Sequence, residues 1–392
     1  MSLFDEIIAN PKKYLYYHDD YNLIGKFENF LNIPGQKNAE RFINSYFEAG
    51  GKKKVFLTDF NEKYLVKGKH LHTVSLYLLG CHLSGIIDDK LKISFKKSAA
   101  GQNDWYEFSY TWFLTSLYHD SSCVIEDDTL PVGSCETFKN LEHHLGKHDV
   151  MHNVYNYMDK LCKKLRVSAN NQKFLRDGAE YFTFPEATVK NYFFYRADSM
   201  NSIDHGILAG YIMFDRLIKN YEEAWGNASS SDHDNFEFKS LSWRIEHKYH
   251  FAVIANSIIA HNIWYASKEA QEKYKIYGLD PLLSATAEKI SISRWPLLFF
   301  LGLLDTIEPV KRFPSLQPKE VWENLDIEYV NGRIIISNIG ERIRCGVKSE
   351  YESWINAIYT MPNWLAVQIE PENKMSEIDC ITISPLEEGK DV

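Results

Sequence analysis

Histidine and aspartate residues stand at the ends or on the inward faces of five apolar, helix-periodic segments of this chain. Burying an imidazole or a carboxylate without a polar partner costs several kcal/mol. The chain must therefore fold so that these side chains meet one another or a shared ligand. The residues concerned are His72, His119, Asp120, His205, His261 and Asp305.

The apolar residues around these positions recur at intervals of three and four, the period of a helix with one buried face. A largely apolar segment ends in the adjacent pair His119 and Asp120, and another apolar run ends in Asp305. A single histidine on such a face is usually a core residue satisfied by hydrogen bonds. Several segments that each carry one ligand inward indicate a metal site instead.

The ligand types restrict the metal and its chemistry. Imidazoles combined with carboxylates suit Fe, Mn, Zn or Co, and the absence of cysteine from the set argues against a purely structural zinc site. Two ions that share a carboxylate convert water to hydroxide near neutral pH and neutralise charge on a phosphoryl oxygen. The cluster therefore favours hydrolysis of a phosphate ester or anhydride.

The order His, His-Asp, His, His, Asp resembles the HD superfamily of metal-dependent phosphohydrolases in its longer, two-metal form. The triplet YHD that ends at Asp120 matches the doublet that names the superfamily. The stretch DHGILAG from Asp204 and the stretch LLDTIEPVKR up to Arg312 are similar to motifs of its bis(5′-nucleosyl)-tetraphosphatase branch. The resemblance covers about residues 66–315 and implies a mainly α fold, an HD-domain helical bundle.

The resemblance also implies how two divalent transition-metal ions share the ligands. One ion is held by His72, His119, Asp120 and Asp305; His205 and His261 complete the second site, with Asp120 bridging. The chain departs from the family where Ser121-Ser-Cys123 replaces a frequent Gly-Lys, and where long insertions occur, one at about 88–108 and one between His119 and His205. The substrate therefore does not carry over from the family.

One ligand has a rival close by in the sequence. His70 lies on a different predicted helix face from His72, so only one of the two can point inward. We favour His72 because the Thr73-Val74-Ser75 that follows it resembles the small-residue pattern of the family.

Three basic residues are candidates for binding the substrate phosphate. Lys311 and Arg312 lie one to two helical turns beyond the last acidic ligand, and a guanidinium suits phosphate. The alternative is a basic helix end that complements the helix dipole. His250 lies on the predicted face of His261, where it either meets the phosphate or pairs with Glu246.

Two further patterns have ordinary explanations. His144, His148 and His152 recur at intervals of four on one predicted helix face. They form either a separate metal site or, as we favour, a solvated or lid-facing stripe, because no further ligand is evident. Asp204 is expected to cap the helix that begins with His205.

Charge and composition exclude several classes of function. The net charge of −9 and the pI near 5.9 provide no basic field for nucleic acid, which weighs against an HD nuclease. Six scattered cysteines without a CxxC pair suggest reduced thiols. The N-terminus lacks a signal-peptide pattern, and no apolar run approaches a membrane span. A cytoplasmic protein without a membrane partner is expected; a homo-oligomer is compatible with the sequence.

Three regions are predicted along the chain. Residues 1–65 form an accessory N-terminal segment with a strand-like Val55–Leu57, and residues 66–315 form the helical domain with its insertions and a loop at 226–235. Residues 316–392 form a small α+β C-terminal subdomain. In that subdomain Asn331-Gly332 predicts a hairpin turn between two strands, followed by a helix at 350–360 and strands near 365–369 and 378–384.

These patterns predict an enzyme that hydrolyses a phosphoester or phosphoanhydride bond in a nucleotide or another small phosphorylated metabolite. Asp120 anchors the metals, and Lys311, Arg312 or His250 binds the phosphate. The alternative is a regulatory HD module that senses nucleotides without turnover. The complete ligand set favours the enzyme, since a sensor would tolerate the loss of ligands.

Overall fold

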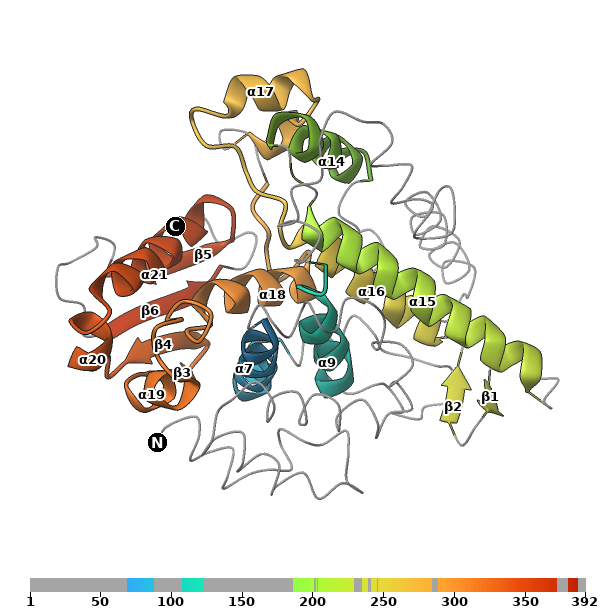
Figure 1. The fold of residues 1–392 in the computed structure, drawn as a ribbon, viewed down its shortest axis with the longest axis horizontal. Helices are drawn as coiled ribbons and strands as arrows, with labels where there is room; N and C mark the ends of the chain where they lie inside the picture. Colours follow the sequence, from blue (N-terminus) through green and yellow to red (C-terminus); the bar gives the residue numbers. More distant parts are fainter. Residues whose placement is uncertain are drawn as a thin grey trace. The chain divides into compact units, whose positions relative to one another are not determined.

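The fold is described from a computed structural model of the whole chain (Figure 1). The structure describes residues 69–87, 108–122, 186–200, 202, 204–228, 235–238, 241–244, 246–283, 288–371 and 380–386. Three predicted features lie outside these residues: the N-terminal segment 1–65, residues 88–107 of the predicted insertion, and the stripe of His144, His148 and His152.

The chain divides into two compact units. Unit 1 comprises Met1–Lys92, Tyr106–Leu117 and Glu288–Val392, and unit 2 comprises Ile93–Trp105 and Tyr118–Ala287. Most of the described residues are helical, and a small antiparallel sheet lies near the C-terminus. A mainly α fold with a small C-terminal subdomain is thereby confirmed. None of the helices in the described ranges is long and apolar enough to cross a membrane.

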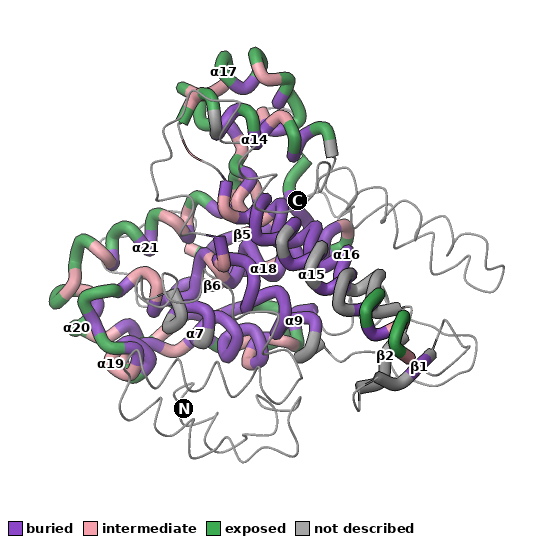
Figure 2. Tube along the Cα trace, turned by 45° about the vertical axis from the view of Figure 1, so that its right-hand side comes forward, coloured by how far each residue is buried: buried purple, intermediate pink, exposed green. Residues whose placement is uncertain are grey.

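Helix α18 (Pro296–Ile307) is the core helix of unit 1. Its sequence is apolar on all sides, so every residue except Asp305 is buried, as Figure 2 shows along its length. Pro296 occupies the first turn, where its missing N–H costs nothing. α18 packs against α7 (Lys69–His82) and α21 (Lys348–Thr360), and Trp354 Nε1 of α21 donates to Ile307 O at 3.2 Å.

A glycine sets the distance between α7 and α9 (Phe108–Tyr118). A Cβ atom on Gly80 would lie 2.0 Å from Trp112 Nε1, so only glycine admits the indole at this position. The indole donates to Tyr77 O at 3.0 Å and packs edge-on against Phe300, with ring centroids 4.9 Å apart. α9 belongs to unit 1 as far as Leu117.

The C-terminal part of unit 1 is a four-stranded antiparallel sheet in the order β3-β4-β6-β5. Asn331 and Gly332 form the predicted two-residue turn, with φ of 51° and 83°, as a type I′ turn requires. Alternate isoleucines of β4 and β6 are buried, which fixes the register. The strands are β3 (Asp326–Val330), β4 (Arg333–Ser337), β5 (Val367–Glu370) and β6 (Cys380–Pro385).

Short elements complete unit 1. Pro318 occupies the first turn of a short helix. The helix predicted near 350–360 and both later strands are confirmed. The short elements are η2 (Ser84–Ile86), α19 (Pro318–Glu323), α20 (Glu341–Arg344) and η5 (Met361–Asn363).

Unit 2 is centred on two antiparallel helices, α15 (His205–Asn227) and α16 (Glu246–Ala260). Small residues let them approach closely at the end that carries His205. A Cβ atom on Gly206 would lie 2.8 Å from the His261 ring, and one on Gly210 would lie 2.7 Å from Ala255 O. The other elements are α14 (Glu186–Met200), β1 (Asn235–Phe238), β2 (Leu241–Arg244), α17 (Gln271–Ile276) and η4 (Asp280–Leu282).

The region between α15 and α16 differs from the sequence prediction. The predicted loop at 226–235 begins later, because α15 continues to Asn227, and a hairpin of β1 and β2 interrupts a stretch predicted as helical. Phe236 of β1 packs against Tyr221 and Trp225 of α15, with ring centroids 5.4 and 5.3 Å away. These contacts with α15 stabilise the hairpin, which has no Asn-Gly turn that could have been recognised in the sequence.

Candidate metal centre

The predicted ligands belong to two groups, one in each unit, and each group is described on its own. We call His72, Ser75, Asp305, Glu308 and Lys311 of unit 1 the His72 cluster. We call His119, Asp120, Asp204, His205, His261 and Asn262 of unit 2 the Asp120 cluster.

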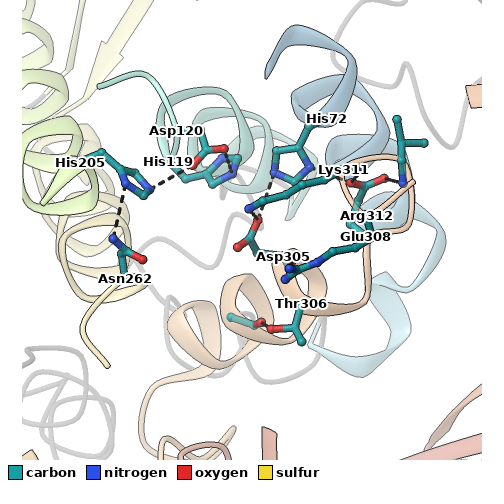
Figure 3. A network of polar contacts seen from close by, with 12 residues as sticks. His72, His119, Asp120, His205, Asn262, Asp305, Thr306, Glu308, Lys311 and Arg312 are labelled. Atoms are coloured by element: carbon teal, nitrogen blue, oxygen red, sulfur yellow. Dashed lines mark hydrogen bonds and ion pairs between the residues drawn. The ribbon is translucent and has the colours of Figure 1, made fainter. Parts of the chain in front are cut away.

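His72 is buried on the inner face of α7 and meets a carboxylate at each ring nitrogen. Its Nε2 lies 3.0 Å from Asp305 Oδ1, and its Nδ1 lies 2.7 Å from Glu308 Oε2 (Figure 3). A carboxylate oxygen accepts but does not donate. Each ring nitrogen therefore needs a proton, or the Nε2 position needs a metal ion. The side chain of His70 lies outside the described residues.

The electrostatics of His72 follow from these neighbours. Burial and the nearby Lys311 ammonium lower the pKa of His72, but the hydrogen bonds to Asp305 and Glu308 outweigh them and raise the pKa above its usual 6.5. When His72 is charged, a proton occupies the space beside Nε2. A divalent cation would compete with that proton for the same lone pair.

Glu308 is fully buried and accepts four hydrogen bonds. Oε2 accepts from His72 Nδ1 and, at 3.0 Å, from Lys311 N; Oε1 accepts from Ser75 Oγ and, at 2.8 Å, from Val310 N. We had not predicted Glu308 or Ser75 as site residues. The signal lay in the sequence, because Glu308 belongs to the stretch LLDTIEPVKR.

The basic residues after α18 lie beside Asp305. Lys311 Nζ donates to Asp305 Oδ1 at 2.8 Å, and Arg312 Nη2 lies 3.5 Å from Asp305 O. Arg312 Nε is buried and has no hydrogen-bond partner among the described atoms. The side chain of His250, the third predicted phosphate ligand, lies outside the described residues.

The Asp120 cluster begins at the end of α9. His119 and Asp120 follow the last helical residue and are buried. Asp120 Oδ1 lies 3.1 Å from His205 Nε2, and Asp120 Oδ2 lies 3.6 Å from His119 Nε2. Ligand atoms of Asp120, His205 and His261 all lie within 4.8 Å of one another, close enough to hold one metal ion.

His261 directly follows α16, and its ring is held by the backbone. Its Nδ1 lies 2.6 Å from Ile258 O, which can only accept, so Nδ1 carries the proton and Nε2 presents a lone pair. The ring packs edge-on against His119 and His205, with centroids 5.5 and 5.3 Å away. His261 is therefore preset as a ligand through Nε2.

His205 is the first residue of α15, where Asp204 caps the helix as predicted. Asp204 Oδ1 accepts from Ile207 N at 2.9 Å, and Oδ2 accepts from Asn262 Nδ2 at 2.8 Å. The same amide nitrogen lies 3.4 Å from His205 Nδ1. Asn262 was missed in the sequence, since an asparagine in a loop carries no pattern.

A hydrogen-bonded chain fixes the loop after His261. Trp264 Nε1 donates to Asn262 Oδ1 at 2.8 Å, and Tyr274 Oη donates to Trp264 O at 2.9 Å. Because the amide oxygen of Asn262 accepts from the indole, its nitrogen must be the atom that faces Asp204. The orientation of Asn262 is thereby set from both sides.

The structure thus brings His72 together with Asp305, and Asp120 together with His119, His205 and His261. Asp120, His205 and His261 of the Asp120 cluster could hold one metal ion, and imidazoles with a carboxylate are the donor set that suits Fe, Mn, Zn or Co. Comparisons of the chain with protein-family models, curated proteins and solved structures found no match.

Proposed function

We propose that the chain is a metal-dependent phosphohydrolase of the HD type that acts on a nucleotide or another small phosphorylated metabolite. The observation that carries the proposal is the convergence of Asp120, His205 and His261 from three separate segments, with ligand atoms within 4.8 Å. Groups this polar are costly to bury unless they share a cation or protons.

The His72 cluster supports the same function. Asp305, a predicted ligand, has the cations Lys311 and Arg312 beside it, so a metal-binding carboxylate and potential phosphate ligands occur together. Divalent ions bound by these residues would supply an activated water and neutralise charge on the phosphoryl group. Asp120, His205 and His261 would hold such an ion.

The residues of the chain would perform the remaining tasks. His72 and His261 offer Nε2 lone pairs whose direction is fixed by the acceptor behind each ring. Lys311 and Arg312 would bind and orient the substrate phosphate. This division of tasks matches hydrolysis by an activated water, with no covalent intermediate on the protein.

A phosphate-release screen on metal-loaded protein tests the proposal. The full chain is stripped with a chelator, reloaded with Mn, Fe(II), Co or Zn, and offered nucleotides, dinucleoside polyphosphates and sugar phosphates. We expect phosphate release that requires metal and is abolished in Asp120→Ala. The exposed Asp280→Ala on η4 is the matched control in unit 2 and should retain full activity. Nucleotide binding without turnover under every metal would favour the sensor instead.

A further inference from the structure

We infer that Glu308 is a positioning residue that selects the tautomer of His72 and couples this ligand to the turn that carries Lys311 and Arg312. The inference rests on the proposed function, because it assigns Glu308 a task in the metal centre. It starts from one buried carboxylate whose four hydrogen bonds reach both α7 and the turn after α18.

The two carboxyl oxygens of Glu308 are surrounded by hydrogen-bond donors. Two of the four groups that face it are backbone N–H groups, which can only donate, and each oxygen receives two bonds. These bonds use the four lone-pair sites of an ionised carboxylate. His72 Nδ1 must then be a donor, so a neutral His72 carries its proton on Nδ1 and not on Nε2.

Asp305 competes for the same proton from the other side of the ring, but it is the weaker acceptor. Its distance to Nε2 is 3.0 Å, against 2.7 Å for the contact of Glu308 with Nδ1. Lys311 Nζ also donates to the same Asp305 oxygen at 2.8 Å, which already compensates its charge. The geometry therefore assigns the proton to Nδ1 and presents the Nε2 lone pair beside Asp305, as metal binding needs.

The second task of Glu308 concerns the turn after α18. The bonds from Val310 N and Lys311 N fix the backbone from which the Lys311 side chain reaches Asp305. The same carboxylate is bonded to Ser75 and His72 of α7. Glu308 thus fixes the positions of both His72, a candidate metal ligand, and the turn that carries Lys311 and Arg312, the candidate phosphate ligands.

Glu308→Gln separates the chemical role from simple space filling. The amide has nearly the same shape, and its oxygen can still accept from Ser75 Oγ and Val310 N. Its NH₂ group, however, would face His72 Nδ1 and Lys311 N, which places donors against donors. His72 is then expected to move its proton to Nε2, where it donates to Asp305 and blocks the metal.

The test combines tautomer and metal affinity in the full chain. Long-range ¹H–¹⁵N NMR of ¹⁵N-histidine-labelled, metal-free protein at mildly alkaline pH reports which nitrogen of His72 is protonated, with His72→Gln to assign the signal. We expect Nδ1–H in the wild type and Nε2–H in Glu308→Gln, and Mn²⁺ or Zn²⁺ affinity lower by about 10–100-fold. Two controls, Ser75→Ala and the exposed Glu328→Gln on β3, should keep Nδ1–H.

The outcomes separate this inference from the proposed function. Nε2–H in the wild type would overturn the inference, and this measurement needs no variant to fold. An unchanged tautomer and unchanged metal affinity in a folded Glu308→Gln would overturn it too. If the tautomer and the metal affinity shift as expected while the wild type releases no phosphate from any ester, the inference stands and the proposed function fails.

Discussion

His72 and His261 are both presented through Nε2, but the groups behind their rings differ in charge. The Nδ1 of His72 faces a buried carboxylate at 2.7 Å, whereas the Nδ1 of His261 donates to a neutral backbone carbonyl at 2.6 Å. A carbonyl orients the ring, while a carboxylate also makes the imidazole more basic. The two imidazoles therefore differ in the charge of the group that holds the ring.

The difference extends to the rest of each cluster. His72 is flanked by two carboxylates, of which one is shared with Lys311. In the Asp120 cluster one ligand carboxylate serves several imidazoles, and the amide of Asn262 lies behind His205. We therefore expect protons to compete with metal most strongly at the His72 cluster.

Asp120→Ala should have the largest effect on turnover. Asp120 is the carboxylate that contacts His119 and His205, so its loss removes the counter-charge beside these two imidazoles. We expect phosphate release to fall by several orders of magnitude, with no rescue by added metal. Residual activity within about tenfold of the wild type would remove Asp120 from the centre.

His261→Ala should weaken metal binding by more than replacement of Asn262, and excess metal should partly restore activity. Loss of a ligand removes a bond to the ion. Asn262→Ala instead removes the hydrogen bonds to Asp204 and Trp264 and the contact with His205 Nδ1, and loss of a group behind a ligand typically costs about 10–100-fold in affinity. Titration with Mn²⁺ or Zn²⁺ measures both. Equal affinities of His261→Ala and the wild type would contradict the assignment of His261 as a ligand.

The stability of the metal-free protein should depend on pH through the protonation of His72. Because the folded-state pKa of His72 is raised above 6.5, its protonation stabilises the fold below the unfolded pKa, and this contribution is lost as the pH rises through the folded pKa. The wild type should therefore exceed His72→Gln in free energy of unfolding at acidic pH, and this difference should decrease towards alkaline pH. Urea unfolding with chelator present measures it; a difference that grows with pH would mean a lowered pKa.

Arg312→Ala should produce the smallest effect. A guanidinium that binds the substrate phosphate acts in the ground state as well as in the transition state, so we expect KM to rise about tenfold and kcat to change less. Arg342→Ala on α20, which pairs with Glu320 at the surface, is the matched control. If both variants show the same steady-state constants as the wild type, Arg312 is the basic helix end considered above.

The sequence predicted those parts of the molecule that local patterns encode. The apolar run before Asp305 predicted a buried helix, and Asn331-Gly332 predicted the hairpin, because a helix period and a type I′ turn leave direct residue signals. The β1–β2 hairpin was missed because Phe236 packs against aromatic residues of α15, and the sequence of the hairpin itself does not indicate this contact.

The site residues were likewise predictable only where the local sequence pattern indicates them. The ligand types are rare on apolar helix faces, so His72 and His261 stood out. Asn262 did not, because a loop asparagine carries no pattern until the fold brings it beside an imidazole. Glu308 belongs to the stretch LLDTIEPVKR, but only its contact with His72 shows what it does. Residues that orient ligands are recognised by their contacts, which appear only in three dimensions.

The central claim is that these clusters hold metal, and anomalous diffraction from crystals of the metal-loaded chain tests it most directly. Data collected on both sides of the absorption edge of the loaded metal locate the ion independently of the protein atoms. We predict an ion bound by Asp120, His205 Nε2 and His261 Nε2 at about 2.0–2.2 Å. An ion bound elsewhere, with these three side chains bonded only to one another, would contradict the account.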